Sequence, residues 1–196
     1  MKKIILVTGN QGKLIYARGV LRDFKIKVIQ RELEINEGRS HDPKKIVKEK
    51  ALQAYEQIKG PLLIEDSGIF IEELGGFPKT MIHFAEETVG IEGILKLMQG
   101  VENRAAEFRS ALAFISAEYL EPIIFEEVDG GFTIAKKVWE TTGLILGEFD
   151  RILIPPGEIR TNSVLSQQER VIRQKVRKKQ THWYKFGKWY SGRLKK

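Results

Sequence analysis

The chain opens with a pattern of apolar and polar positions typical of α/β proteins. The continuous apolar run at residues 4–7 predicts a buried strand that ends at a turn beginning with Thr8. Apolar positions then recur at helical spacing over residues 12–22, and apolar residues alternate with lysines over 24–28. The first 28 residues therefore predict a strand, a loop, a helix and a second strand.

A long helix and a second buried strand follow. Asp42 and Pro43 suit a helix start, because aspartate caps free backbone N–H groups and proline fits the first helical position. The apolar positions keep the helical period as far as Gly60, and the lysines of this helix, Lys50 among them, are expected to face water. Residues 62–64 predict a buried strand that ends in the acidic segment 65–68, and a further strand is predicted at 69–71. Acidic groups at a strand end are well placed for chemistry in an α/β protein.

The rest of the chain gives a coarser pattern. Helices are predicted at 80–88 and 91–99, an antiparallel meander at 105–117, 121–128 and 132–139 with a turn at Gly130-Gly131, a strand at 151–154, a last helix at 164–178 and an irregular tail beyond it. Neither a repeat nor a clear linker divides the chain. We therefore expect one two-lobed domain over residues 1–178, followed by a tail at 179–196.

Length and composition limit the class of protein. With 196 residues, 42% hydrophobic and 30% charged, the chain is expected to fold as an ordinary globular protein. No apolar run approaches the roughly 18 residues of a membrane span, and the N-terminus does not resemble a signal peptide, so we expect a soluble cytoplasmic protein. The sequence has no cysteine, which excludes disulfides, thiolate metal sites and a cysteine nucleophile.

The net charge of +7 is concentrated at the end of the chain. Eleven Lys or Arg and no acidic residue lie between Arg170 and Lys196, so the remaining residues carry a net charge of −4. The tail also mixes its cations with five aromatic residues, a composition suited to phosphate backbones and base stacking. The alternative, which we prefer, is that Trp183, Phe186 and Trp189 pack on the body of the protein or on a dimer partner while the lysines stay solvated. The three histidines, His41, His83 and His182, lack metal-ligand spacing and are interpreted as surface or packing residues.

The first loop has the features of an anion site. The segment Thr8-Gly9-Asn10-Gln11-Gly12-Lys13 follows a strand and opens a helix, where exposed N–H groups and the positive helix end meet polar side chains and one ammonium group. It matches neither the longer Walker A pattern nor a dinucleotide fingerprint. Phosphate binding and a plain turn with a surface lysine both remain open from these residues alone.

The acidic segment 65–68 is the second candidate. In an extended chain, the side chains of Glu65 and Asp66 point to opposite faces and cannot share a role. One carboxylate can support a hydrogen-bond network while the other binds Mg²⁺ or accepts a proton from water. An ordinary acidic turn is the alternative.

Taken together, these motifs resemble a known family. Thr8-Gly9-Asn10-x-x-Lys13, the run from Glu65 to Ile71, Gly76-Phe77-Pro78 and the run from Gly93 to Leu97 are similar, in order and spacing, to the motifs of the inosine/xanthosine triphosphate pyrophosphatases. The resemblance covers residues 1–116 and extends more loosely to 178. It implies an α/β fold with an elongated mixed sheet flanked by helices, two lobes and a central cleft. It also implies Mg²⁺-dependent hydrolysis of a purine nucleoside triphosphate to monophosphate and pyrophosphate, by a homodimer.

The resemblance also assigns roles by position. Asp66 would be the general base and a metal ligand, with Lys13 and Glu65 beside it in the catalytic group. Glu37 is the nearest match to the other metal-binding carboxylate, with Glu34 as the alternative. The expected substrate contacts are Thr8, Gly9, Asn10, Lys13, Ser67, Phe149, Asp150, Gln167 and Gln168.

The chain departs from the family pattern at several positions. Tyr16 replaces a glutamate of the first motif, and Lys79-Thr80-Met81-Ile82 replaces a glycine and an aromatic residue. Only an aspartate and an aromatic neighbour remain of a Phe-Gly-Tyr-Asp segment, at residues 146–150. Ser166-Gln167-Gln168 stands for a Ser-His-Arg motif, and Asn162 for the basic residue before it. Because most changes fall on the base pocket, recognition is affected more than hydrolysis. A weak or inactive relative that binds nucleotide or RNA is the alternative function.

Overall fold

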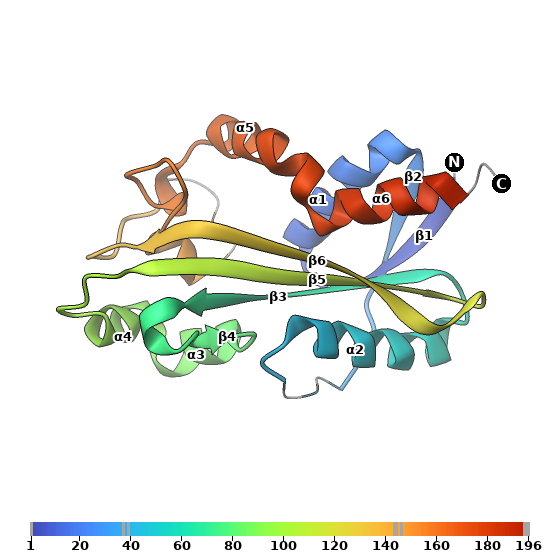
Figure 1. Ribbon diagram of the computed structural model, residues 1–196, viewed down its shortest axis with the longest axis horizontal. Coiled ribbons are helices and arrows are strands. Elements are labelled where there is room, and N and C mark those ends of the chain that lie inside the picture. Colours follow the sequence, from blue (N-terminus) through green and yellow to red (C-terminus); the bar gives the residue numbers. More distant parts are fainter. Residues whose placement is uncertain (1, 37, 39, 143–144, 146, 194–196) are drawn as a thin grey trace. The chain divides into compact units, whose positions relative to one another are not determined.

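The computed structural model describes residues 2–36, 38, 40–142, 145 and 147–193, and the fold is α/β as predicted (Figure 1). The hydrogen-bonded strand order is β2-β1-β3-β5-β6-β7, with β4 beside β3. The chain divides into two compact units. Unit 1 comprises residues 1–67, 110–127 and 177–196, and unit 2 comprises 68–109 and 128–176. The strands are β1 (Lys2–Val7), β2 (Ile26–Arg31), β3 (Leu62–Ile71), β4 (Pro78–Lys79), β5 (Ala105–Ser116), β6 (Tyr119–Ile134) and β7 (Leu153–Ile154).

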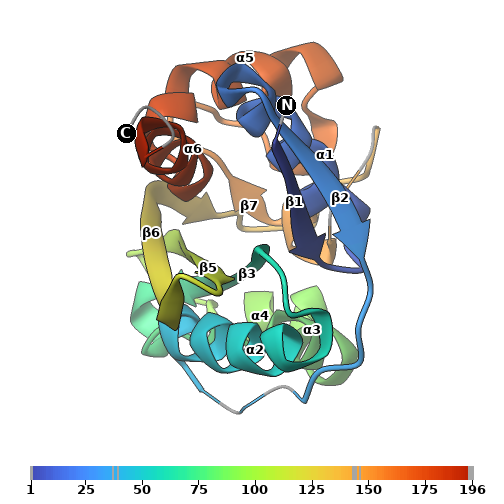
Figure 2. The ribbon, with the colours of Figure 1, turned by 90° about the vertical axis from the view of Figure 1, so that its right-hand side faces the viewer.

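Unit 1 is built on parallel strands covered on both faces. β1 pairs in parallel with β2 and with β3. The helices of this unit are α1 (Gln11–Leu21), α2 (Pro43–Ile58) and α6 (His182–Gly192), with short 3-10 turns at Arg22–Phe24 and Lys178–Gln180. Figure 2 shows α2 on one side of the strands and α6 on the other. Because parallel sheets need cover on both faces, their strands read as continuous apolar runs, as residues 4–7 and 62–64 do.

Strand alternation sends neighbouring side chains of unit 1 into two different cores. Ile4, Leu6 and Leu63 join a first cluster with α1 and α6, whereas Val7 and Ile64 join a second cluster with α2. α2 begins as predicted, because the Asp42 side chain accepts a hydrogen bond from the Lys44 N–H at 3.0 Å. The two clusters hold α1 and α2 on opposite sides of β3.

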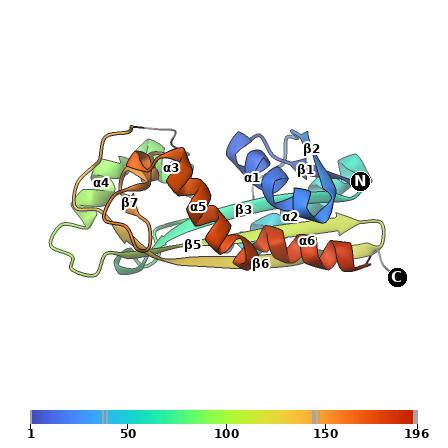
Figure 3. The same ribbon diagram turned by 90° about the horizontal axis from the view of Figure 1, so that it is seen from above.

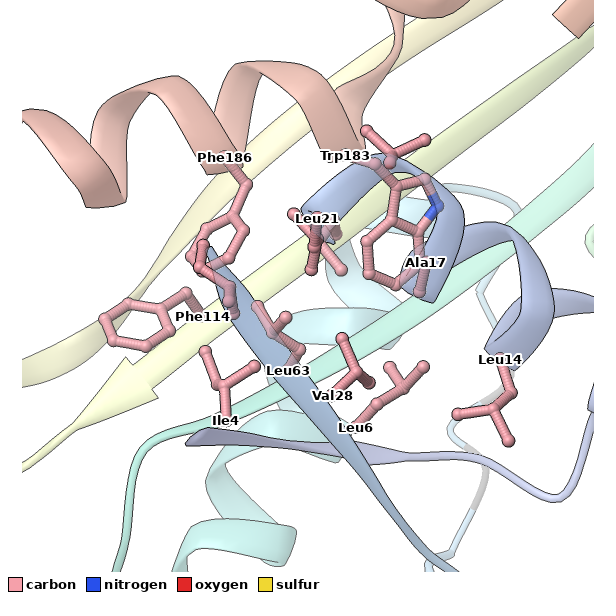
Figure 4. Packing of buried hydrophobic residues seen from close by; sticks show 13 residues of the cluster. Ile4, Leu6, Leu14, Ala17, Leu21, Val28, Leu63, Phe114, Trp183 and Phe186 are labelled. Carbon is pink, nitrogen blue, oxygen red and sulfur yellow. The ribbon is translucent and has the colours of Figure 1, made fainter. Parts of the chain in front are cut away.

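The tail is a helix, and the prediction of an irregular segment was wrong. α6 lies alongside α1 (Figure 3), and Trp183 and Phe186 are 2% and 0% exposed in the first cluster (Figure 4). Gly187 permits this close packing, since an added Cβ would lie 2.3 Å from the Phe24 ring. The preferred interpretation of the tail aromatics, docking on the body of the protein, is confirmed for these two residues.

Unit 2 carries α3 (Ile82–Thr88), α4 (Gly90–Leu97) and α5 (Gln167–Arg177), with 3-10 turns at Glu72–Leu74, Glu148–Arg151 and Asn162–Val164. α3 and α4 lie next to each other (Figures 1 and 3) and belong to a third core cluster with residues of β3, β6 and β7. β4 approaches β3 so closely that a Cβ on Gly68 would lie 2.6 Å from the Lys79 carbonyl oxygen. Only glycine fits at that point of the strand.

Two predicted breaks in the strands are absent among the residues that the structure describes. β3 runs without interruption through the acidic segment, although strands were expected to end before Glu65 and restart at Ile69. β6 is likewise one strand, and Gly131 takes a φ of +82° inside it instead of forming a turn. The strand expected to begin at Phe24 starts at Ile26, after a 3-10 turn. The acidic residues are therefore held by strand backbone on both sides.

Candidate functional site

The loop from Thr8 to Asn10 forms a capped helix start. The Asn10 side chain accepts a hydrogen bond from the Lys13 N–H at 3.0 Å, and the Asn10 N–H donates to Thr8 Oγ1 at 3.1 Å. Gly9 and Asn10 are exposed, and a Cβ on Gly9 would have the Glu32 side chain, 3.9 Å away, as its nearest neighbour. The loop thus combines open space with the positive end of an eleven-residue helix.

Gln30 at the end of β2 connects both sides of this loop. Its side-chain amide donates to the Thr8 carbonyl oxygen at 3.0 Å and to Glu32 at 3.2 Å. Its side-chain oxygen accepts a hydrogen bond from Gln11 at 3.4 Å. The backbone of the loop is therefore fixed from β2 as well as from α1.

Lys13 reaches from α1 to β3. Its ammonium nitrogen lies 2.8 Å from Glu65 Oε2 and donates to the Glu65 carbonyl oxygen at 3.3 Å. The Glu65 side chain is only 6% exposed. This contact is an ion pair. The family glutamate that Tyr16 replaces is absent, and Tyr16 packs against the first core cluster.

Asp66 has a different lysine. Its Oδ2 lies 2.9 Å from the ammonium nitrogen of Lys50 in α2, and its Oδ1 accepts a hydrogen bond from the Ser67 N–H at 2.8 Å. Lys50 is 12% exposed, so the expectation that it faces water was wrong. Glu65 and Asp66 pair with helices on the two sides of β3, and the predicted opposite orientation of their side chains is confirmed.

The loop before α2 contains the candidates for the second metal-binding carboxylate, Glu37 and Glu34. Glu37 lies outside the described residues, and Glu34 is exposed. Asn36 is tied to α2 by two hydrogen bonds with Gln53, whose side chain accepts from the Asn36 N–H at 3.1 Å and donates to its carbonyl oxygen at 3.2 Å. Within the described parts of the chain, no three His, Asp or Glu side chains come close enough to hold a metal ion by themselves.

The residues expected at the base pocket lie in unit 2. Asp150 is 9% exposed, and its Oδ1 accepts a hydrogen bond from the Asn162 side chain at 3.1 Å. Its Oδ2 lies 3.8 Å from Nη1 of Arg170. Phe149 is 3% exposed in the third core cluster, so its ring packs in the core rather than on the surface, where a substrate contact was expected.

Gln167 and Gln168 are exposed in the first turn of α5. The Ser166 and Glu169 side chains cap this turn reciprocally, at 2.8 Å and 3.3 Å. Hydrogen bonds from Arg160 and Ser166 lower the pKa of the Glu169 carboxyl to about 2. Both glutamines therefore lie in the first turn of a helix with a capped N-terminus, and both are exposed to solvent.

Three contacts of these groups were missed by the sequence interpretation: Lys50 with Asp66, Gln30 with Thr8, and Arg170 with Asp150. A signal existed for Lys50, which follows Val47 by three residues and precedes Ala54 by four, so that it shares the buried face of α2. No local pattern marks Gln30 or Arg170, because the partner of each, Thr8 for Gln30 and Asp150 for Arg170, is distant in the chain.

The fold and these contacts define the class of protein: an α/β protein in which a capped strand-to-helix loop adjoins a strand with two lysine-paired carboxylates. The chain belongs to the Ham1 family, whose sequence model matches residues 4–178. The dITP/XTP pyrophosphatase of Saccharolobus solfataricus is 33% identical over 168 residues, or 86% of this chain and 84% of that protein. The protein of the same name from Methanopyrus kandleri is 33% identical over 98% of both chains. The family resemblance drawn from the motifs is confirmed.

Solved structures agree on the fold. The Ham1 protein of Coxiella burnetii has a TM-score of 0.76 at 24% identity and covers 100% of this chain and 99% of its own. The Ham1 protein of Staphylococcus aureus has a TM-score of 0.73 at 20% identity, with 99% and 98% covered. Across the ranges described by the structure, no helix is both long and apolar enough to cross a membrane.

Nucleic-acid binding by the tail was expected to use exposed aromatic rings and cations, and the structure removes some of each. Trp183 and Phe186 are buried and offer no ring face to a base. Two tail cations also have protein partners, because Lys185 donates to the Glu126 carbonyl oxygen at 2.6 Å and Lys178 lies 2.5 Å from Asp23. These contacts do not favour RNA binding by the tail.

Proposed function

We propose that this protein hydrolyses nucleoside triphosphates with non-standard purine bases, such as inosine and xanthosine triphosphate, to the monophosphate and pyrophosphate. The observation that carries the proposal is the pairing of Lys13 with Glu65 and of Lys50 with Asp66 on the two faces of β3, next to an open helix N-terminus. The relatives from S. solfataricus and M. kandleri bear the name of this activity.

The phosphate chain would bind at the loop. The exposed backbone of Gly9, the side chains of Thr8 and Asn10 and the start of α1 offer hydrogen-bond donors and a positive potential to anionic oxygens. Lys13 is 30% exposed and would share its charge between Glu65 and the phosphates. Ser67, which follows the general base in β3, would contact the substrate.

Asp66 would accept the proton from water. As the water oxygen bonds to the α-phosphorus, its proton passes to the Asp66 carboxylate, and the bond to the bridging oxygen breaks to release pyrophosphate. Lys50 fixes the orientation of this carboxylate from α2, and the Ser67 N–H holds its other oxygen. Lys13 would stabilise the negative charge that develops on the phosphate oxygens.

The donor set fits Mg²⁺. Asp66 and Glu37 supply only oxygen ligands, and Mg²⁺ commonly uses one or two carboxylates together with substrate phosphates and water. Among the described residues, each Asp66 oxygen has one hydrogen-bond partner, which leaves lone pairs for a second cation. The ion would supply charge neutralisation of the phosphates when bound.

Base recognition would centre on Asp150. Its carboxylate is nearly buried and is held by Asn162, with Arg170 close by, so its position is well defined. Gln167 and Gln168 present exposed amides that can donate and accept hydrogen bonds at a base edge. Phe149, the chain neighbour of Asp150, would support the position of this residue from the third core cluster. The proposal also includes a homodimer in the cytoplasm, and light scattering on the purified protein tests the dimer.

The test is pyrophosphate release from inosine, xanthosine and the standard nucleoside triphosphates with Mg²⁺. Asp66→Asn preserves the shape of the side chain but removes the proton acceptor, so we expect a loss of kcat of about 10²-fold or more. Glu121→Gln is the matched surface control, because Glu121 is 71% exposed, and it should leave the rate unchanged. Absence of release from every substrate with the wild-type chain would overturn the proposal, and nucleotide binding measured by calorimetry would then identify a binding relative.

A further inference from the structure

Three charged or titratable side chains, two of them largely buried, form a cluster next to Glu65. They are Glu127 near the middle of β6, His182 at the first position of α6, and Arg177 at the last position of α5. The side chains of Glu127 and His182 are 10% and 6% exposed. No role in the mechanism above requires them, although burial of such groups is costly unless they are paired.

Glu127 holds the start of α6. One of its oxygens accepts hydrogen bonds from the His182 backbone N–H at 3.2 Å and lies 2.8 Å from His182 Nδ1, and the other accepts from Arg177 at 3.0 Å. Burial raises the pKa of the Glu127 carboxyl, but the bonds and charges of His182 and Arg177 outweigh burial and hold the pKa below its ordinary value. Since an ionised carboxylate only accepts hydrogen bonds, we assign the proton of this contact to Nδ1.

The other nitrogen of the imidazole points toward the candidate site. His182 Nε2 is buried, has no hydrogen-bond partner among the residues that the structure describes, and lies 3.9 Å from Glu65 Oε1. The second oxygen of the same carboxylate lies 2.8 Å from the Lys13 ammonium. The Glu65 carboxylate is therefore enclosed between the imidazole of α6 and the ammonium of α1.

We propose that His182 is a positioning residue: its imidazole, oriented by Glu127, limits the movement of the Glu65 carboxylate and thereby keeps Lys13 in place. The effect on turnover rests on the proposed function, whereas the effect on Lys13 does not. The matched family segment ends at residue 178, so this contact is supplied by a helix beyond it. The C-terminal helix then contributes to the site as well as to the core.

Two substitutions separate positioning from a capping role. An asparagine amide occupies the place of Nδ1, so His182→Asn retains a donor toward Glu127 and leaves the space beside Glu65 empty. A glutamine amide reaches the place of Nε2, so His182→Gln retains a polar group beside Glu65 and loses the donor to Glu127. If His182 positions Glu65, His182→Asn should change Lys13 reactivity and kcat more than His182→Gln does. If His182 acts only as a structural cap, His182→Gln should have the larger effect.

The first measurement does not depend on turnover. Trace labelling of the full chain with acetic anhydride, followed by mass spectrometry, gives the relative reactivity of each lysine. We expect Lys13 to react several-fold faster in His182→Asn than in the wild type, and to remain near the wild-type rate in His182→Gln. Lys48, which is 50% exposed and pairs with Glu121, is the internal reference.

The second measurement is steady-state pyrophosphate release. We expect kcat to fall about tenfold in His182→Asn with little change in KM, because a displaced group acts on the transition state, and to stay within about threefold in His182→Gln. Lys185→Gln changes an exposed residue of the same helix and should match the wild type.

The outcomes are distinct for the two proposals. Unchanged Lys13 reactivity in His182→Asn overturns the positioning role, whatever the activity. A greater loss of kcat in His182→Gln than in His182→Asn also overturns it and leaves a structural cap. If the wild type releases no pyrophosphate but Lys13 becomes more reactive in His182→Asn alone, positioning of Lys13 is supported and the proposed function fails.

Discussion

Glu65 and Asp66 are neighbours in β3, yet each pairs with a lysine from a different helix, Lys13 of α1 at 2.8 Å and Lys50 of α2 at 2.9 Å. Because neighbouring side chains of a strand point to opposite faces of the sheet, the two carboxylates lie in different environments. The Glu65 side chain is 6% exposed and that of Asp66 is 16% exposed, so the less buried acid is the one proposed to meet water. Adjacent acids can therefore perform different tasks without competing for one partner.

The contact between Lys50 and Asp66 gives the first prediction. Lys50→Met keeps the length of the side chain and removes its charge, so the Asp66 carboxylate loses the group that orients it. We expect kcat for pyrophosphate release to fall about 10²-fold, because a misplaced catalytic group has effects of that size. Lys48→Met, on the same helix but at a side chain 50% exposed, should have little effect. Equal rates in the two variants would contradict the assignment.

The docking of α6 gives a second prediction, from a matched pair of glycines. Replacing a helical glycine by alanine usually stabilises a helix by up to about 1 kcal/mol. Gly192 has no atom within 4 Å of an added Cβ, so Gly192→Ala should show such a gain. Gly187→Ala would place a Cβ 2.3 Å from the Phe24 ring and should lower the free energy of unfolding by about 1–3 kcal/mol. Urea denaturation measures both, and changes of the same sign would refute tight packing at Gly187.

The sequence predicted the parallel part of the fold well, because its signals are local. The apolar run at 4–7, the Asp42 cap and the helical period of α2 each depend on residues a few positions apart. The same holds in principle for α6, where Trp183, Phe186 and Tyr190 follow helical spacing. Residues 179–196 were nevertheless expected to form an irregular tail.

The uninterrupted course of β3 could not be predicted in this way. A polar segment after an apolar run usually marks a strand end, but the charges at Glu65 and Asp66 are satisfied by lysines 52 and 16 residues away along the chain. These lysines belong to helices on the two faces of the sheet, and a short stretch of sequence around β3 does not indicate such partners. For the same reason the contact between Glu65 and His182 appeared only in the structure.

The start of α5 gives a prediction on pH. The folded protein holds the pKa of Glu169 at about 2, below the ordinary value of 4.5, so the ionised carboxylate stabilises the fold at pH above 4.5. This contribution is lost as the pH falls from about 4.5 toward 2. We expect the difference in unfolding free energy between the wild type and Glu169→Gln to shrink over this range, and an NMR titration of Glu169 to give the low pKa directly. A difference that is constant with pH would disprove the role of the charge.

Discrimination between bases should depend more on Asp150 than on the two glutamines. The Asp150 carboxylate is 9% exposed and is held by Asn162 at 3.1 Å, so a hydrogen bond from a base would meet an oriented acceptor. Gln167 and Gln168 are exposed, and their flexible amides would lose entropy on binding. We expect Asp150→Asn to reduce the ratio of kcat/KM for inosine triphosphate over ATP by about tenfold or more, since an unmatched buried polar group costs 1–3 kcal/mol. Gln167→Ala should change the ratio by less than about threefold on the same scale. Loss of discrimination in Gln167→Ala alone would contradict this prediction and place the base contact on α5. Thermal unfolding of both variants would verify that neither effect comes from a damaged fold.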